Sequence, residues 1–319
     1  MKDGAPKLII VIPCYNEEET IPATHHLFAD ELDSLVNGGL VSQESRILLV
    51  DDGSSDSTWK VISELAKDNS KFIGIRQSRN RGHQFALWAG LMEARNLGCD
   101  ITITIDCDGQ DDVHAMTDMV KEYANGSDVV YGVRNDRSTD TFFKKVTAEG
   151  FYRLQAAMGV EVVFNHADYR LLSARVIDAL LQYREVNLYL RGLIPLVGFK
   201  NAQVSYKREK RMAGEGHYGL FKMLAFAVDG ITSLTVRPLH WILTCALLMT
   251  FSGVAALIAM LIAYMAGWSC PCVAVIAATI VLVGGLQLTA IGVVGEYIGK
   301  AYIELKDRPR VIISERTWK

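Results

Sequence analysis

Residues 9–18 read IIVIPCYNEE and residues 48–58 read LLVDDGSSDST, so two short apolar runs are each followed directly by polar and acidic residues. Further β-rich runs recur along the first half of the chain, with helix-like stretches between them. Strands that alternate with helices predict a parallel sheet covered on both faces. Ligands of such folds bind beyond the carboxyl ends of the strands, which is where these polar motifs fall.

The apolar runs predict strands, and the amphipathic stretches between them predict helices. The expected strands are 8–12, 47–50, 72–75, 101–105, 129–133 and 202–206, and the expected helices are 20–36, 57–67, 84–96 and 113–125.

A long uncharged region occupies the last third of the chain. No Lys, Arg, Asp or Glu occurs from Pro238 to Gly295, which is long enough for two membrane crossings of about 20 residues each. Helices are expected at 239–266 and 273–297. Basic residues on both outer flanks predict that the flanks and the preceding domain are cytoplasmic, in a multi-pass protein of the inner (cytoplasmic) membrane. The alternative is a buried helical hairpin in a soluble protein.

The charge of the chain limits its partners. The formal net charge is −3, which argues against a general nucleic-acid binder because such proteins carry a basic excess or stripe.

A third polar motif, DCDGQDD at 106–112, follows the expected strand at 101–105. Clustered carboxylates repel one another unless a cation lies among them, and oxygen ligands favour Mg²⁺ or Mn²⁺. Such a cation would neutralise a departing diphosphate. A solvated acidic turn is the alternative for this motif, and a turn followed by a helix N-cap is the alternative for each of the first two.

Six segments resemble the family 2 glycosyltransferases with a GT-A fold, in particular the polyprenyl-phosphate hexose transferases such as bactoprenol glucosyltransferases and dolichol-phosphate mannose synthase. They are IIVIPCYNEE, LLVDDGSSDST, SRNRGHQFALWAG, DCDGQD, ADYRLLS and LTAIGVVGEYIGKAYIELKDRP. The resemblance implies a Rossmann-like GT-A domain with a mainly parallel sheet at 1–215. An amphipathic juxtamembrane segment at 216–237, a two-helix transmembrane hairpin at 238–299 and a basic cytoplasmic tail at 300–319 would follow.

The resemblance also implies roles for individual residues. The nucleotide would contact Pro13, Tyr15, Asn16, Glu17, Asp52 and Asp106, and the metal and diphosphate would contact Asp106, Asp108 and Gln110. The residues expected at the reaction centre are Asp108, Asp168 and Arg170. The lipid phosphate would contact Arg134, Arg208, Arg211 and His217.

The family's inverting geometry implies one in-line displacement, with no covalent sugar–enzyme intermediate. Asp168 is the position considered for a base in this branch, but a lipid phosphate is already ionised near neutral pH and needs little deprotonation. Asp168 is therefore also a candidate for orienting a sugar hydroxyl or an arginine.

Two departures from the family pattern affect these roles. Gly109 and then Asp111 and Asp112 follow the second acidic residue, where relatives carry Leu-Gln and prolines. His217 stands where relatives carry lysine, which would make a phosphate contact there sensitive to pH.

The expected reaction is transfer of a hexose, preferably glucose from UDP-glucose, to a polyprenyl (undecaprenyl) phosphate. GDP-mannose and other nucleotide-sugars remain alternative donors, because the selection of the nucleotide base and of the sugar depends on single contacts. A processive polysaccharide synthase is less favoured, since the chain has no Gln-x-x-Arg-Trp motif. A non-catalytic membrane scaffold is the alternative of another class. The lipid bilayer and further copies of the chain are the other expected partners.

Overall fold

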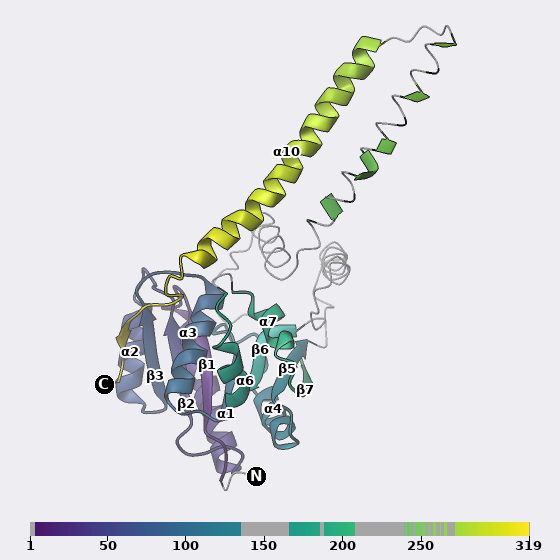
Figure 1. Cartoon of the computed structure of the whole chain (residues 1–319). Helices are drawn as coiled ribbons and strands as arrows, with labels where there is room; N and C mark the ends of the chain where they lie inside the picture. Colours follow the sequence, from purple (N-terminus) through teal and green to yellow (C-terminus); the bar gives the residue numbers. More distant parts are fainter. Residues whose placement is uncertain are drawn as a thin grey trace.

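A computed structural model describes residues 4–134, 166–185, 188–207, part of 239–266, and 272–318. In this part of the chain, eight strands form one sheet in the order β7-β5-β6-β4-β1-β2-β3-β8 (Figure 1). The strands are β1 (Leu8–Cys14), β2 (Arg46–Asp51), β3 (Phe72–Gln77), β4 (Ile101–Thr104), β5 (Val129–Arg134), β6 (His166–Ser173), β7 (Asn201–Tyr206) and β8 (Ile313–Arg316). The helices are α1 (Thr20–Asn37), α2 (Thr58–Asp68), α3 (His83–Asn96), α4 (Ala115–Ala124), α6 (Ala174–Leu180), α7 (Leu190–Leu196) and α10 (Cys272–Leu305).

The sheet separates two hydrophobic cores. Successive side chains of a strand point to opposite faces, so Ile10 and Ile12 of β1 enter one core while Ile9 and Val11 enter the other. Helices α1, α2 and α4 cover the first face, and α3, α6 and α7 cover the second. Every residue of β1 is buried, as expected for a central strand covered on both sides. The predicted α/β fold with a mainly parallel sheet is confirmed.

One central strand runs against the others. β3, β2, β1 and β4 are parallel, whereas β6 lies antiparallel between β4 and β5. Because β6 runs opposite to β4, its first residues lie beside the carboxyl end of β4. The topology therefore brings the segment that begins at His166 to the edge where the polar motifs gather.

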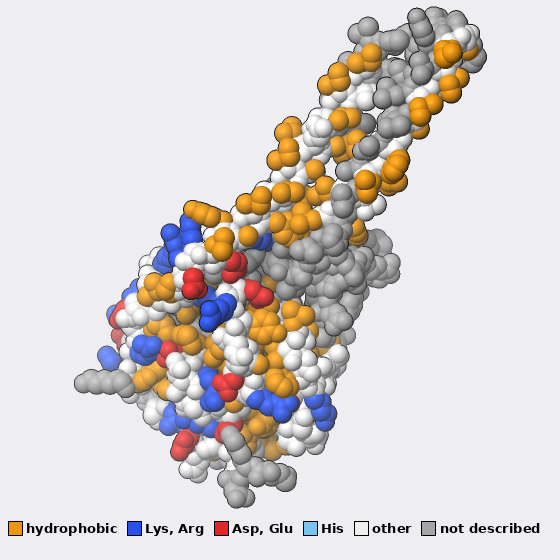
Figure 2. Space-filling model, in the orientation of Figure 1, with side chains coloured by type: hydrophobic (Ala, Val, Ile, Leu, Met, Phe, Trp, Pro, Cys, Tyr) orange, Lys and Arg blue, Asp and Glu red, His pale blue; other side chains and the backbone are white. Residues whose placement is uncertain are grey.

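Helix α10 extends away from the sheet (Figure 1), and exposed apolar side chains lie along it (Figure 2). Charged residues enter its carboxyl-terminal part at Glu296, Lys300 and Glu304. Among the residues that the structure describes, no helix combines the length and apolar character needed to cross a membrane. The prediction of two transmembrane helices is therefore wrong for this part of the chain, and so is the prediction of a multi-pass membrane location. The expected amphipathic segment at 216–237 lies outside the described residues.

The carboxyl-terminal segment returns to the sheet as β8, a strand that the sequence analysis missed. β8 pairs antiparallel with β3. Arg316 donates to both carboxylate oxygens of Glu93 on α3, with Nε–Oε2 3.0 Å and Nη2–Oε1 2.8 Å. Arg310 lies 4.6 Å from the ring centre of Trp88 and donates to the carbonyl oxygen of Tyr183. Residues from both sides of α10 in the sequence thus belong to one folded domain.

We expect Arg316→Gln to lower the free energy of unfolding by about 1–2 kcal/mol, because the buried carboxylate of Glu93 loses a bidentate charged partner. The control is Lys121→Gln, which removes a lysine from an exposed pair with Asp118 and should cost less than about 0.5 kcal/mol. Denaturant unfolding of both variants checks the difference. Equal losses of stability in the two variants would show that the ion pair between Arg316 and Glu93 contributes little.

Candidate active site

The loops that follow β1 and β2 are joined to each other by hydrogen bonds. The backbone N–H of Asn16 donates to Ser54 Oγ (3.0 Å), and Asn16 Oδ1 accepts from the Ser55 N–H (3.0 Å). The Glu17 N–H donates to Thr58 Oγ1 (2.8 Å). Asn16 has φ 55°, a left-handed conformation that asparagine tolerates better than most residues. Asn16 therefore shapes the predicted nucleotide site by holding the two loops together.

The other predicted nucleotide contacts of the first loop differ in accessibility. Pro13 is buried within β1, whereas Tyr15 is 46% exposed and Glu17 is half-buried. Of these three residues, Tyr15 presents the largest accessible surface to a flat base.

Asp52 is buried and binds the loop between β3 and α3. Its Oδ1 accepts from Gln77 Nε2 (3.0 Å) and from the Arg81 N–H (2.9 Å), and its Oδ2 accepts from the Gly82 N–H (2.8 Å). Burial raises the pKa of Asp52, although the two backbone donors oppose that shift. Its contacts make Asp52 a residue that positions the start of α3, in addition to its predicted place near the nucleotide.

Gly53 explains why this turn approaches the β3–α3 loop so closely. Its φ is +66°, and a Cβ at this position would lie 2.4 Å from the backbone carbon of Arg79. Any side chain at position 53 would therefore push the two loops apart.

The acidic motif lies directly after β4. The Asp106 side chain is 39% exposed, while Asp108 is buried and its Oδ1 accepts from the Gln110 N–H (3.1 Å). Burial raises the pKa of Asp106, and the negative charges of Asp168, Asp111 and Asp108 add to the rise, although His83 opposes it. Carboxylates that repel one another in this way favour a bound cation.

The donor set fits a cation that is shared with a substrate. Within the described ranges, no group of three or more His, Cys, Asp or Glu side chains is arranged to hold a metal ion by itself. Mg²⁺ in phosphate-transfer sites commonly has one or two carboxylate ligands and completes its shell with water and phosphate oxygens. Asp106 and Asp108 match that pattern, and Gln110 is next to them.

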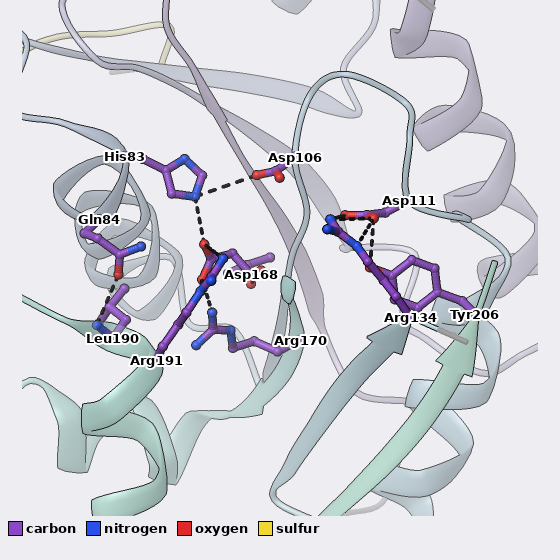
Figure 3. A network of polar contacts seen from close by, with 11 residues as sticks. His83, Gln84, Asp106, Asp111, Arg134, Asp168, Arg170, Leu190, Arg191 and Tyr206 are labelled. Atoms are coloured by element: carbon purple, nitrogen blue, oxygen red, sulfur yellow. Dashed lines mark hydrogen bonds and ion pairs between the residues drawn. The ribbon is translucent and has the colours of Figure 1, made fainter. Parts of the chain in front are cut away.

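A second cluster surrounds Asp168 on β6 (Figure 3). Arg191 of α7 donates to both of its oxygens, with Nε–Oδ1 3.2 Å and Nη2–Oδ2 2.9 Å, and Arg170 donates to Oδ1. His83 Nε2 lies 3.4 Å from Asp168 Oδ2 and 3.7 Å from Asp106 Oδ1. His83 therefore connects the Asp168 cluster to the acidic motif.

The pKa values of Asp168 and His83 in this cluster are shifted from their ordinary values. Burial opposes ionisation of Asp168, but the guanidinium groups of Arg191 and Arg170 hold its pKa well below the usual range. Burial lowers the pKa of His83, yet the contacts with Asp168 and Asp106 outweigh it and raise that pKa overall. Asp168 is thus an ionised, weakly basic carboxylate, which suits an orienting role better than that of a general base.

Arg134, predicted to contact the lipid phosphate, is paired inside the protein. Its Nη2 lies 3.1 Å from Asp111 Oδ1, and its Nε donates to Tyr206 Oη (3.2 Å). Tyr206 Oη also donates to Asp111 Oδ1 (2.7 Å). Figure 3 shows this trio beside the Asp168 cluster. The other predicted lipid-phosphate residues, Arg208, Arg211 and His217, lie outside the described residues.

Sequence reasoning missed His83 and Arg191. His83 lies within a segment quoted for the family resemblance, and it follows an expected strand as the other polar motifs do, so its position was the available signal. Arg191 belongs to a short helix with no recognisable motif. Only the fold brings it to Asp168.

The carboxyl edge of the sheet therefore carries its polar groups in a defined order. Asp52 follows β2, Tyr15 follows β1, the acidic motif follows β4, and Asp168 lies on β6, with Arg134 on the next strand. A family model for glycosyl transferase family 2 matches residues 9–181, more than half of the chain. The chain belongs to this family.

Relatives of this glycosyltransferase match over nearly its whole length. "Uncharacterized glycosyltransferase YkoT" of Bacillus subtilis is 44% identical over 98% of this chain and 93% of the relative. "Prophage bactoprenol glucosyl transferase homolog" of Escherichia coli is 35% identical over 96% of this chain and 98% of the relative. Among solved structures, the mannosyltransferase PcManGT of Pyrobaculum calidifontis, in complex with GDP-Man and Mn²⁺, is 16% identical with a TM-score of 0.44 and covers 96% of this chain and 91% of that one.

Proposed function

We propose that this family 2 glycosyltransferase transfers a hexose from a nucleotide-sugar to a polyprenyl phosphate, with glucose from UDP-glucose as the preferred case. The observation that supports it most is the 35% identity to a bactoprenol glucosyl transferase homologue, which extends over 96% of this chain and 98% of the relative. The product, a polyprenyl-phosphate sugar, would serve modification of a cell-envelope glycan.

Apolar surface near the domain fits a lipid-linked acceptor. Ile291, Ile298 and Leu305 are each more than half exposed. They lie in the carboxyl-terminal half of α10, whose end meets the sheet domain (Figure 1). A long isoprenoid chain requires apolar contacts of this kind, because its burial from water is what makes binding favourable.

The proposed reaction is one in-line displacement. A phosphate oxygen of the acceptor attacks the anomeric carbon, the bond between that carbon and the diphosphate oxygen breaks, and the nucleoside diphosphate leaves with the bonding electron pair. The acceptor phosphate is ionised near neutral pH, so the step needs no strong base. Asp168 would instead fix Arg170, Arg191 and His83, and catalysis would rest on positioning and on charge stabilisation.

Asp106 and Asp108, with Gln110 beside them, would hold Mg²⁺ or Mn²⁺. When bound there, the cation supplies positive charge that stabilises the departing diphosphate. Tyr15 would cover the base, and the loop pair held by Asn16 and Ser54 would cradle the nucleotide.

We expect purified protein to transfer radiolabel from one donor of a panel of UDP- and GDP-hexoses into organic-extractable undecaprenyl phosphate. Transfer should require Mg²⁺ or Mn²⁺ and should stop with EDTA. Label from UDP-glucose would support the preferred donor, and label from GDP-mannose would replace it. If no donor gives extractable label although nucleotides bind, a rarer donor sugar becomes the first alternative and a non-catalytic scaffold the second.

A further inference from the structure

Strand β8 lies along the end of β3 that leads into the proposed nucleotide site. It pairs with residues 75–77 of β3, and the backbone N–H of Ser78 donates to the carbonyl oxygen of Ile312 (2.9 Å). Gln77 in turn donates to Asp52, one of the predicted nucleotide contacts. The strand that follows α10 therefore supports the segment of β3 whose next residues enter the site.

Arg76 joins β8 to Asp51, a carboxylate that the proposed mechanism does not use. The Asp51 side chain is 0% exposed, its Oδ1 accepts from the Ser54 N–H (2.9 Å), and its Oδ2 lies 3.3 Å from Arg76 Nε. Arg76 Nη1 donates to Glu315 Oε1 on β8 (3.1 Å). Burial raises the pKa of Asp51, and the charge of Arg76 opposes that rise. Arg76 therefore stabilises the ionised carboxylate that holds Ser54.

Glu315 contacts the elements on both sides of the turn between β2 and α2. Its Oε1 accepts from Arg76, which pairs with the carboxylate at the start of that turn. Its Oε2 accepts from Trp59 Nε1 (3.0 Å) in the first turn of α2. The neighbour of Trp59, Thr58, accepts from the Glu17 N–H of the loop after β1. One side chain of β8 thus braces the turn at both of its ends.

We propose that Arg76 is a positioning residue for the donor nucleotide and that Glu315 holds it in place from β8. Arg76 acts through Asp51, which fixes Ser54, and Ser54 Oγ accepts from the Asn16 N–H of the loop after β1. Residues that contact a ligand keep their geometry only when the groups behind them are fixed. The inference rests on the proposed function, because it concerns the nucleotide of the proposed donor.

A second ion pair on β8 separates positioning from stability. Arg316, the residue after Glu315, pairs with Glu93 on α3. Successive side chains of a strand point to opposite faces, so this pair lies on the other side of the sheet from Glu315 and its contacts. Loss of the Arg316 pair should destabilise the docking of β8, yet it leaves the charge beside Asp51 in place.

The test compares Arg76→Gln with the wild-type full chain by calorimetric titration with UDP, and with GDP in parallel, in the presence of Mn²⁺. We expect the dissociation constant of the nucleotide that the wild type binds to rise at least about fivefold, because the turn loses the charge that stabilises Asp51. The KM for the nucleotide-sugar should rise with it, whereas the KM for a short-chain isoprenyl phosphate should change less than about twofold. Arg76→Lys keeps a positive charge and should restore most of the nucleotide affinity.

Arg316→Gln is the matched control. It should lower stability, as predicted above, while its dissociation constant for the nucleotide stays within about twofold of wild type. The inference is wrong if Arg76→Gln binds the nucleotide like the wild type, if Arg316→Gln weakens binding as much, or if Arg76→Lys restores nothing.

Glu315→Ala decides the matter if Arg76→Gln does not fold. It removes the contacts with Arg76 and Trp59 from an exposed position and should raise the nucleotide dissociation constant by about threefold. An unchanged constant in this variant would contradict the role of β8. If the wild type binds neither UDP nor GDP, the proposed function itself fails, and this inference falls with it.

Discussion

Asp108→Ala is expected to reduce sugar transfer by at least about a hundredfold, because the variant loses one of the two carboxylates proposed to hold the cation at the departing diphosphate. The fold should persist, since Asp108 lies in the loop after β4, where its Oδ1 accepts from the backbone N–H of Gln110 two residues away. Transfer rates at saturating donor and acceptor measure the loss. Titration with UDP in the presence and absence of Mn²⁺ should show that the cation strengthens UDP binding to the wild type alone.

The control comes from the same motif. Asp112 Oδ1 accepts from the His114 N–H (3.0 Å) just before α4 begins. Asp112→Ala should therefore lower the free energy of unfolding by about 1 kcal/mol, as loss of one hydrogen bond does, while transfer stays close to wild type. If Asp108→Ala retained more than a tenth of the wild-type rate, the cation assignment would have to be abandoned.

Asp168→Asn is expected to lower the free energy of unfolding by about 3 kcal/mol and the transfer rate by at least about a hundredfold. The stability loss follows because removing one charge of a buried ion pair leaves the other, on Arg170, without its counterion. The rate loss follows because Arg191 and His83 lose the group that orients them. Denaturant unfolding and single-turnover transfer measure the two effects separately.

The effect of pH on this variant has a definite sign. The pKa of Asp168 is lowered on folding from an unfolded value of about 3.9, so its stabilisation is complete above that value and is lost as pH falls through the lower folded pKa. The stability difference between wild type and Asp168→Asn should therefore shrink in strong acid. It should also shrink as pH rises through the raised pKa of His83, because the variant lacks the contact with Asp168 that raises this pKa. Asp178→Asn, which breaks an exposed pair with Arg95, should cost less than about 1 kcal/mol. Stability of Asp168→Asn equal to that of Asp178→Asn would contradict the buried-pair account.

Hydrophobic patterning was sufficient to predict most of the catalytic fold. The buried apolar runs that became β1, β2, β3 and β4, and the amphipathic stretches between them, matched the structure to within a few residues. The order of the strands was not predictable in the same way, because patterning gives no information about pairing partners. The antiparallel insertion of β6 between β4 and β5 was therefore missed, although it places Asp168 at the site.

The carboxyl-terminal strand was missed for a different reason. Residues 313–316 read ISER, a short polar edge strand that looks like a charged tail until β3 is present to pair with it. The uncharged run at 238–295 correctly predicted a helix in its second half, where α10 forms. Apolar composition did not, however, establish membrane-spanning helices among the described residues.

The location of the candidate site residues was predictable where they follow strands and carry a motif, and their roles stay predictions. Tyr15, Asp106 and Asp108 are of this kind, and the fold brings their loops to one edge of the sheet. The partners that fix the charge of Asp168 were not predictable, because Arg191 is 23 residues away in the sequence and reaches Asp168 only through the packing of α7. Ion pairs of this type depend on tertiary structure.

Mass spectrometry of the lipid product tests the central proposal most directly. Purified protein, a short-chain polyprenyl phosphate, the active nucleotide-sugar and Mn²⁺ should yield a lipid that carries one hexose on its phosphate, together with an equal amount of nucleoside diphosphate, and Asp108→Ala should yield neither. Free hexose without a modified lipid, or chains of several hexoses, would contradict transfer of a single sugar to a polyprenyl phosphate.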